Sequence, residues 1–359
     1  MPTSHTIRHR NGEYPVLIGA GLLEELAFLA ERHLAGRRLA VITDRNVARA
    51  LESHLPVPTL VVAPGERSKS RRRWADLSDK LLTLGFGRDA GIVALGGGVV
   101  GDLAGFVAST YLRGVPWLQA PTSLLAMVDA SVGGKTGVDT AHGKNLIGAF
   151  HPPVAVVADP RALRTLPEAV YRAGLAEVIK HGVIADAEYL AWVERETNAI
   201  LRRDETVLVR LVHRSVEIKG AVVARDEFET GERAILNAGH TVAHAIETVS
   251  GYEVPHGEAV AIGLVAEAAL AEELGLAAAG ISDRIRTISD ALGLPVMLPE
   301  DFLVDDLLEA MSHDKKNRNG AIRFALPSAI GRMVRDGERW TVEADRVAIA
   351  AALRGVGAA

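Results

Sequence analysis

The chain has 359 residues, of which 48% are hydrophobic and 24% charged, with a formal net charge of −5. This balance excludes a disordered chain, and without an excess of basic residues we expect no nucleic-acid partner. With no cysteine, disulfides and thiolate chemistry are excluded, which favours a reducing, cytoplasmic location. No apolar run reaches the roughly 18 residues of a membrane helix and no signal peptide is recognisable, so we expect no membrane partner. The length predicts two domains.

Short apolar runs alternate with helical patterns in the first half of the chain. The expected strands are Leu39–Thr43, Thr59–Val62, Ile92–Leu95, Trp117–Gln119 and Val154–Val157. Helical patterns lie between them, over 22–34, 70–84 and 103–112. Because such strands are typical of a sheet covered on both faces, we predict an α/β domain with a parallel sheet over 1–167. A mostly helical domain is expected over 168–359, with a late strand pair at 322–326 and 330–334.

A glycine-rich turn, Gly96-Gly-Gly-Val-Val-Gly101, follows the third expected strand. A turn of this kind brings backbone N–H groups against a pyrophosphate at a helix start. It satisfies G-x-G-x-x-G, but it is not in the first strand–helix unit and lacks the acidic residue about twenty positions later. We therefore predict a non-standard dinucleotide site, with a purely structural turn as the alternative. Polar residues also follow the two earlier strands: Asp44, Asn46, Glu66 and Lys69.

A second polar, glycine-rich segment spans residues 121–145. Its candidate ligand-binding residues are Thr122, Ser123, Asp129, Lys135, Lys144 and Asn145. These groups suit a phosphorylated, polyhydroxylated ligand. Gly134-Lys135-Thr136 resembles the end of a Walker A loop but lacks its full spacing, so we do not expect nucleoside-triphosphate hydrolysis. A plain loop is the alternative.

The helical half carries an acid–base pair and a histidine cluster. Glu177 and Lys180 lie three residues apart and share a helix face, with a surface ion pair as the alternative interpretation. His240 and His244 are one helical turn apart, and His256 follows within seventeen positions. Together with Glu177, the histidines supply ligands for a catalytic divalent metal. No glutamate follows His240, which excludes the H-E-x-x-H type of site, and purely structural histidines are the alternative.

On these motifs the chain resembles the 3-dehydroquinate synthases, which are sugar phosphate cyclases. The matching blocks are 96–102, 110–114, 121–137, 143–150, 174–182, 226–247, 256–260 and 314–316. Departures are Val242-Ala243 in place of Phe-Gly, Pro152 in place of Gln and His181 in place of Tyr. The resemblance implies an α/β, Rossmann-like NAD-binding domain over 1–167 and a mostly helical metal- and substrate-binding domain over 168–359. Iron-type alcohol dehydrogenases share this fold.

The resemblance also implies a role for each matching residue. Zn²⁺, with Co²⁺ as an alternative metal, would be held by Glu177, His240 and His256, so that the His240/His244 pair suggested by spacing is not the ligand pair. The substrate phosphate would meet Lys135, Asn145, Asn237, His244 and, from the neighbouring subunit of a homodimer, Arg113. The substrate carboxylate would meet Arg233 and either Lys315 or Lys316. Hydroxyls or the metal surroundings would meet Asp129, Lys180, Lys219 and Glu229. NAD would meet Asp44, Asn46, Glu66, Lys69, Gly98, Val99, Asp102, Thr122, Ser123, Lys135, Lys144 and Thr165.

The implied reaction converts 3-deoxy-D-arabino-heptulosonate 7-phosphate, a small phosphorylated sugar acid, to 3-dehydroquinate and phosphate. It proceeds by oxidation with NAD, phosphate elimination, re-reduction and intramolecular aldol closure. Other cyclases are alternatives. Lys219, Arg233 and Asn237 argue against 2-deoxy-scyllo-inosose and epi-valiolone synthases, whose substrates carry no carboxylate, whereas an aminodehydroquinate synthase stays open. A metal-dependent polyol dehydrogenase is less consistent, because its ligands are one Asp and two His. A non-catalytic nucleotide-sensing module is the remaining alternative.

Overall fold

The computed structural model describes residues 2–51, 55–313 and 321–359. The chain divides into two compact units. Unit 1 comprises residues 1–167 and 205–224, and unit 2 comprises residues 168–204 and 225–359. One long helix, α7 (Glu205–Arg225), therefore belongs almost entirely to unit 1, although it follows two helices of unit 2 in the sequence.

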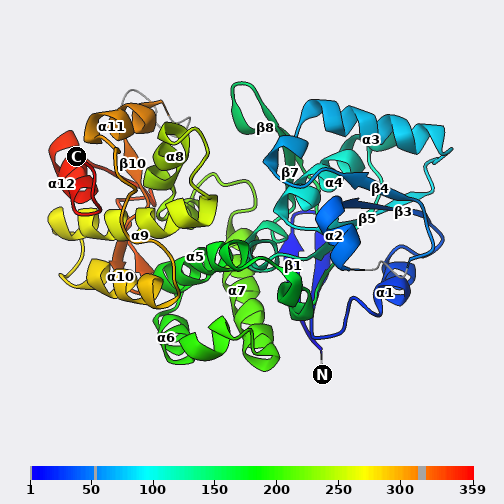
Figure 1. Ribbon diagram of the computed structural model, residues 1–359, viewed down its shortest axis with the longest axis horizontal. Coiled ribbons are helices and arrows are strands. Elements are labelled where there is room, and N and C mark those ends of the chain that lie inside the picture. The colour runs from blue at the N-terminus through cyan, green and yellow to red at the C-terminus, as the bar shows by residue number, and fades with distance from the viewer. Residues whose placement is uncertain (1, 52–54, 314–320) are drawn as a thin grey trace. The chain divides into compact units, whose positions relative to one another are not determined.

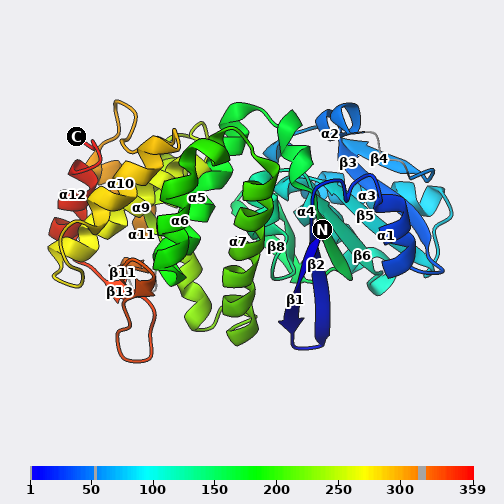
Figure 2. The same ribbon diagram turned by 90° about the horizontal axis from the view of Figure 1, so that it is seen from below.

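Unit 1, which contains the strands labelled β3, β4 and β5 in Figure 1, is built on a seven-stranded sheet with the order β1-β2-β9-β6-β5-β3-β4. Its strands are β1 (Thr3–His9), β2 (Gly12–Ile18), β3 (Arg38–Asp44), β4 (Thr59–Val62), β5 (Ala90–Gly96), β6 (Trp117–Pro121) and β9 (Ala155–Ala158). All neighbouring pairs are parallel except β1 and β2. These two form an edge hairpin, visible in Figure 2, which the hydrophobic pattern did not predict. The predicted parallel α/β architecture is confirmed.

Apolar side chains project from both faces of this sheet, and helices cover both faces. Along β3, Ala40 and Ile42 pack with α3 (Arg71–Thr83) and α4 (Gly98–Thr110) on one face. Leu39 and Val41 pack with α1 (Leu26–His33) on the other face. Because successive strand residues point to opposite faces, one run of apolar residues serves two cores. This burial on both sides explains why the strands show no polar alternation.

Three further elements of unit 1 carry candidate site residues. β7 (Lys135–Thr140) and β8 (Gly143–Phe150) form an antiparallel hairpin where the sequence suggested a glycine-rich loop. Helix α7 lies against β1, since a Cβ on Gly220 would be 2.5 Å from Ile7 Cδ1. Short helical turns complete the unit: α2 (Arg45–Ala50), η1 (Glu66–Ser68), η2 (Tyr111–Arg113), η3 (Ala126–Ala130) and η4 (Pro160–Thr165).

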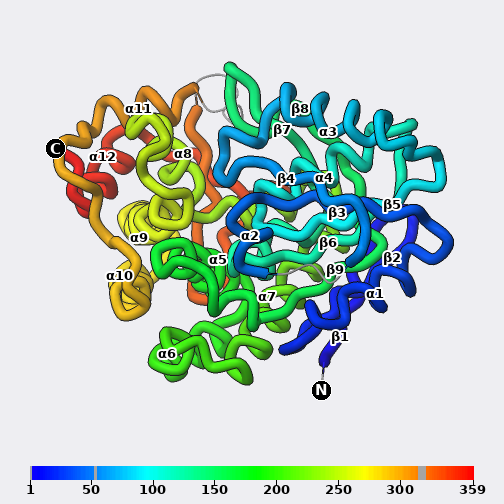
Figure 3. Tube along the Cα trace, turned by 45° about the vertical axis from the view of Figure 1, so that its right-hand side comes forward, coloured from blue at the N-terminus to red at the C-terminus, as the bar shows by residue number. Residues whose placement is uncertain are grey.

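Unit 2 is mostly helical, as the pattern predicted. Its helices are α5 (Glu168–Ala185), α6 (Ala187–Leu201), η5 (Glu232–Asn237), α8 (His240–Val249), α9 (His256–Glu273), α10 (Ile281–Ala291), α11 (Val304–Ser312) and α12 (Arg346–Arg354). Helix α9 is buried along most of its length and packs against α5, α8, α10 and α12 (Figure 3). No helix in the described ranges is long and apolar enough to cross a membrane.

The late strand pair is built differently from the prediction. β11 (Pro327–Ala329) pairs with β12 (Arg332–Met333), whereas β10 (Arg323–Phe324) pairs with β13 (Val342–Glu343). Gly331, with φ +81°, closes a tight turn directly after β11. This turn restricts the first hairpin to a few residues, and β10 is left to pair with the more distant strand.

Candidate active site

The residues predicted to bind a dinucleotide lie at the carboxyl ends of the parallel strands. Asp44 ends β3 and caps α2, where its Oδ1 accepts the N–H groups of Asn46 at 2.8 Å and Val47 at 3.0 Å. Gly98 and Val99 begin α4 directly after β5. No side chain among the described residues caps that helix start. Its backbone N–H groups can therefore bind an anion.

Lys69, beyond β4, is buried among carboxylates. Its Nζ lies 2.5 Å from Asp102 Oδ2 and 3.9 Å from Glu66 Oε1, and its side chain is 6% exposed. Burial lowers the pKa of Lys69, but the charges of Asp102 and Glu66 outweigh burial and leave this pKa above its ordinary value. The ammonium therefore stays charged at neutral pH. Burial raises the pKa of Glu66, although Lys69 opposes the shift.

The segment after β6 meets a lysine from α7. Thr122 and Ser123 follow β6 and are buried. Lys219 Nζ lies 3.0 Å from Asp129 Oδ2 and donates to the Asp129 backbone oxygen at 2.7 Å. Lys219 is itself buried. Because α7 belongs to unit 1, it brings Lys219 against Asp129, although the two predicted residues lie 90 positions apart in the sequence.

The β7–β8 hairpin carries Lys135, Lys144 and Asn145. Lys135 begins β7 and is exposed. Asn145 adopts a positive φ of 55°, and its N–H donates to Asp139 Oδ1 at 2.8 Å. The N–H of Asp139 donates in turn to the Lys69 backbone oxygen at 2.8 Å. Sequence reasoning missed Asp139, which ties the hairpin to the loop after β4; nothing in its local pattern distinguishes it from other aspartates.

Two more predicted residues lie in turns of unit 1. Arg113 is exposed in η2, and its φ of 72° follows a φ of 48° at Leu112. Two consecutive non-glycine residues in the left-handed region cost energy, and such strain clusters at functional sites. Thr165 ends η4, where its hydroxyl donates to the Ala162 backbone oxygen at 2.9 Å.

Three helices of unit 2 bring Glu177, His240 and His256 together. Glu177 lies on α5 and is 1% exposed, while His240 and His256 are the first residues of α8 and α9. One ligand atom from each residue lies within 4.8 Å of the other two. The Nε2 atoms of His240 and His256 are 3.6 Å and 3.7 Å from Glu177 Oε1. Two imidazoles and one carboxylate are the donor set of a catalytic zinc site with an open position.

Both imidazole rings are oriented by a hydrogen-bond partner at Nδ1. His240 Nδ1 lies 3.1 Å from the Ala238 backbone oxygen, and His256 Nδ1 lies 3.2 Å from Glu247 Oε2. Acceptors at Nδ1 fix the tautomer and direct Nε2 to a metal. The arrangement therefore fits a divalent ion at Nε2. Sequence reasoning missed Glu247, because its partner His256 lies on a different helix.

The same cluster carries opposing pKa shifts. Burial holds the pKa of His240 well below its ordinary value, and the Lys180 charge lowers it further. Burial also lowers the pKa of His256, but hydrogen bonds with Glu177 and Glu247 outweigh burial and raise this pKa to about 9. Without metal, the buried Glu177 carboxylate is thus compensated by His256 and by Lys180, which ion-pairs with Glu177 from one turn further along α5.

His244 lies outside this three-residue cluster. Its ring packs edge-on against that of His240, with centroids 5.7 Å apart. The pair suggested by i, i+4 spacing is therefore close in space, but the ligand atoms converge on Glu177 and His256 instead.

A polar loop before α8 holds the remaining predicted residues. Asn237 Nδ2 donates to Glu229 Oε1 at 2.8 Å, and Glu229 has a positive φ of 59°. Arg233 is 2% exposed. Asp226, which the sequence did not single out, accepts the N–H groups of Gly231 at 2.8 Å and Arg233 at 2.9 Å. Lys315 and Lys316 lie outside the described residues.

Comparison with known families decides the relationship of this chain. Residues 59–173 match the 3-dehydroquinate synthase N-terminal family, and residues 174–317 match the 3-dehydroquinate synthase C-terminal family. The chain belongs to the 3-dehydroquinate synthase family. Within this family it is 46% identical over 350 residues to the 3-dehydroquinate synthase of Symbiobacterium thermophilum, covering 93% of this chain and 98% of that protein. The 3-dehydroquinate synthase of Xanthomonas campestris pv. campestris is 48% identical over 336 residues, which cover 89% and 90% of the two chains.

Solved structures of other sugar phosphate cyclases share the fold of this family member. A 2-deoxy-scyllo-inosose synthase complexed with carbaglucose-6-phosphate, NAD⁺ and Co²⁺ superposes with a TM-score of 0.89 at 25% identity, covering 99% of this chain and 100% of that one. The 2-epi-5-epi-valiolone synthase of Streptomyces hygroscopicus subsp. jinggangensis, with NAD⁺ and Zn²⁺ bound, superposes with a TM-score of 0.84 at 30% identity and 96% coverage of each chain.

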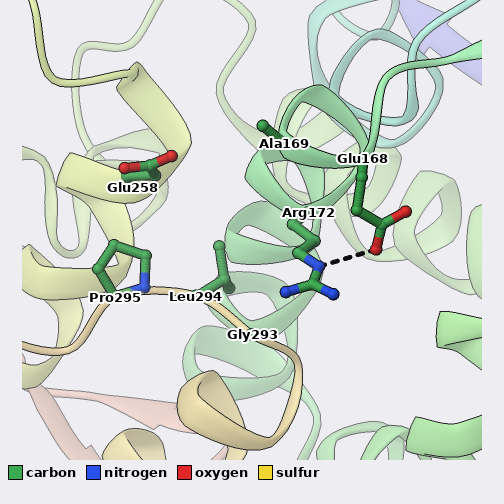
Figure 4. A pocket seen from close by; sticks show the side chains of 7 residues that line it. All are labelled: Glu168, Ala169, Arg172, Glu258, Gly293, Leu294 and Pro295. Atoms are coloured by element: carbon green, nitrogen blue, oxygen red, sulfur yellow. Dashed lines mark hydrogen bonds and ion pairs between the residues drawn. The ribbon is translucent and has the colours of Figure 1, made fainter.

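A surface hollow of about 370 Å³ also lies on unit 2 (Figure 4). Glu168 and Arg172 of α5 form an ion pair at its rim, with Arg172 Nε 2.8 Å from Glu168 Oε1. Glu258 of α9 and the segment 293–295 complete its lining. None of the predicted site residues lines this hollow.

Proposed function

We propose that this chain catalyses the 3-dehydroquinate synthase reaction, from 3-deoxy-D-arabino-heptulosonate 7-phosphate to 3-dehydroquinate and phosphate. The observation that carries the proposal is the convergence of Glu177, His240 and His256 in a chain of this family. The identity of 46–48% to curated 3-dehydroquinate synthases, against 25–30% to the solved cyclases of other specificity, favours this substrate over theirs.

The donor set in unit 2 suits Zn²⁺, with Co²⁺ as the alternative. When bound, the metal supplies Lewis-acid polarisation of the substrate oxygen that is oxidised and later reduced. Glu177 and the Nε2 atoms of His240 and His256 would hold it, while Glu247 and the Ala238 carbonyl keep the rings aligned. Lys180, buried one turn from Glu177, would present its ammonium to a substrate hydroxyl.

We assign NAD binding to the domain 1–167 and metal and substrate binding to the domain 168–359. When bound, NAD would supply a reversible hydride acceptor. The N–H groups at Gly98 and Val99 suit its pyrophosphate. The other proposed contacts are Asp44, Asn46, Glu66, Lys69, Asp102, Thr122, Ser123, Lys135, Lys144 and Thr165.

The substrate carries two anionic ends, and the chain offers basic or amide hydrogen-bond donors for each. For the phosphate we propose Lys135, Asn145, Asn237, His244 and Arg113 of the partner subunit in a homodimer. For the carboxylate we propose Arg233 with Lys315 or Lys316. Asp129, Lys219 and Glu229 would bind hydroxyls. Fixed basic groups hold the leaving phosphate in place, so that its own oxygens can accept the proton removed during elimination. We place the enzyme in the cytoplasm, in keeping with its lack of cysteine.

A phosphate-release assay with the heptulosonate phosphate and a sub-stoichiometric amount of NAD tests the proposal. We expect many turnovers per NAD and no accumulation of NADH absorbance. Stoichiometric NADH would indicate a polyol dehydrogenase. Turnover of the amino analogue of the substrate, without turnover of the heptulosonate phosphate, would indicate an aminodehydroquinate synthase.

A further inference from the structure

A buried carboxylate in the middle of α9 holds the start of α8. Glu267 is 1% exposed. Its Oε2 accepts the N–H of Gly239 at 2.7 Å, and its Oε1 accepts those of Thr241 at 3.0 Å and Val242 at 3.2 Å. These bonds connect residues 25 to 28 positions apart in the sequence. Glu267 therefore acts as a remote cap for the neighbouring helix.

The start of α8 requires such a cap because it has no local one. Gly239 precedes the helix in the left-handed conformation, with φ +78°, and offers no side chain. The first N–H groups of a helix have no partner within the helix, and leaving them unsatisfied in a buried position costs free energy. A carboxylate at this end also interacts favourably with the helix dipole. Its charge is therefore stabilised where burial alone would oppose it.

Close backbone contact brings the carboxylate within reach. A Cβ on Gly263, one turn before Glu267, would lie 2.0 Å from the Gly239 carbonyl oxygen. The first turn of α8 thus rests directly on the backbone of α9. His240 is the first residue of α8, so its position depends on this contact. His256 begins α9 itself.

We propose that Glu267 is a positioning residue for the metal centre: by capping α8 it holds His240 with Nε2 directed at Glu177 and His256. The inference rests on the proposed metal site but not on the identity of the substrate. Helix α9 thus carries His256 itself and, through Glu267, fixes the position of His240.

The test measures Zn²⁺ and Co²⁺ affinity of the metal-free, full-length protein by competition with a chelator. In Glu267→Gln the side chain keeps its shape but loses its charge. Its NH₂ group replaces one of the two acceptor oxygens and cannot accept a hydrogen bond from a backbone N–H. We expect the Kd for either metal to rise 10- to 100-fold, the range seen when groups behind metal ligands are changed. We also expect an altered visible spectrum of bound Co²⁺, because the spectrum reports ligand geometry.

Glu272→Gln is the matched control. Glu272 lies five residues further along α9 and caps α10, where it accepts Ser282 N at 2.8 Å and Ser282 Oγ at 3.1 Å. Loss of this cap should lower thermal stability while leaving the Kd and the Co²⁺ spectrum unchanged. Equal metal affinity and identical spectra in Glu267→Gln and wild type would overturn the inference, as would equal weakening in the two variants. Absence of metal binding by the wild type would instead contradict the proposed metal centre.

Hydrogen exchange in the wild type provides a measurement that does not depend on folding of a variant. Zn²⁺ should slow exchange of the Gly239, Thr241 and Val242 amides, because ligation of His240 and capping by Glu267 favour the same conformation. The Ser282 amide should not respond. Zinc binding without added protection at residues 239–242 would also contradict the inference.

Discussion

Glu247 Oε2 on α8 lies 3.2 Å from His256 Nδ1 on α9. One ring nitrogen of His256 is thereby fixed, and the other faces Glu177 at 3.7 Å. The ring of His244 packs against that of His240, yet His244 is not part of the ligand cluster. Proximity to the other histidines is therefore not sufficient to make a ligand in this site.

The first prediction concerns which histidines hold the metal. His256→Ala should abolish both bound zinc and turnover, because it removes one of three protein ligands. His244→Ala should retain stoichiometric zinc but raise the KM for the phosphorylated substrate. Metal analysis of the purified variants checks both outcomes. Loss of zinc in both variants would favour the His240/His244 pair and contradict the ligand assignment.

The second prediction concerns pH. Burial raises the pKa of Asp226, but hydrogen bonds from the N–H groups of Thr230, Arg233 and Gly231 outweigh burial and leave this pKa below its ordinary value of 3.8. A carboxyl with a depressed folded pKa stabilises the folded state above its unfolded pKa, and this contribution is lost as the pH falls through the folded pKa.

Asp226→Asn should therefore lower the free energy of unfolding by about 1–3 kcal/mol at pH 7. The difference from wild type should shrink at pH 3, which lies below the ordinary pKa of an aspartate and closer to the lowered pKa of the folded state. Urea denaturation at both pH values measures this. Asp79→Asn, at an exposed position on α3, is the control and should change stability little at either pH. A constant difference between pH 7 and pH 3 for Asp226→Asn would refute the explanation.

The third prediction compares two lysines of unit 1. Lys69→Met leaves the Asp102 carboxylate, with 22% of its side chain exposed, without its ammonium partner. Removal of one partner of a buried pair costs about 3–5 kcal/mol, and we expect the lower end because water reaches Asp102. Lys80→Met removes an exposed partner of Asp76 and should cost less than about 1 kcal/mol.

Urea denaturation and NAD titration of the two variants distinguish the roles. Lys69→Met should also weaken NAD binding, whereas Lys80→Met should not. Equal destabilisation by the two substitutions would show that burial of the Lys69–Asp102 pair does not increase its contribution to the free energy of unfolding.

The fourth prediction places Arg113 in a neighbour's site. Arg113→Ala and Lys135→Ala homodimers should each be nearly inactive, since every site lacks one phosphate ligand. After unfolding and refolding together in equal amounts, half of the dimers should be mixed and contain one intact site. About a quarter of wild-type activity should then return, given a two-fold dimer. Refolding Arg113→Ala with an Arg113→Ala/Lys135→Ala double variant should restore nothing. Verified mixed dimers without activity would mean that Arg113 serves its own chain.

The sequence pattern predicted the central strands because each is apolar throughout and short. The strand at 59–62 has the same bounds in the structure, and that at 92–95 lies within β5. The edge hairpin β1–β2 and the hairpin β7–β8 were missed because polar residues interrupt both. Local pattern also gave no reason to place α7 with unit 1, since its assignment depends on tertiary contacts such as Lys219 with Asp129.

For the candidate site, the motifs gave residue types but not their groupings. Helical spacing joined His240 to His244, whereas the structure joins His240 to residues 63 positions before it and 16 after it. The supporting carboxylates Glu247 and Glu267 could not be chosen from the sequence, because the partner of Glu247 is a ring on α9 and the partners of Glu267 are backbone N–H groups at the start of α8. Such partners leave no short-range pattern.

Helices α8 and α9 hold each other's first residues. Glu267 of α9 accepts hydrogen bonds from the first turn of α8, and Glu247 of α8 contacts the ring of His256, the first residue of α9. Two of the three proposed metal ligands, and the two carboxylates that we propose orient them, therefore fall within the 29 consecutive residues 239–267. Contacts at short sequence separation form early and at low entropic cost during folding. This helical hairpin can thus bring His240 and His256 together by itself, and Glu177 completes the cluster when α5 packs against it. Grafting the site into another scaffold would require this one segment and a single carboxylate opposite it.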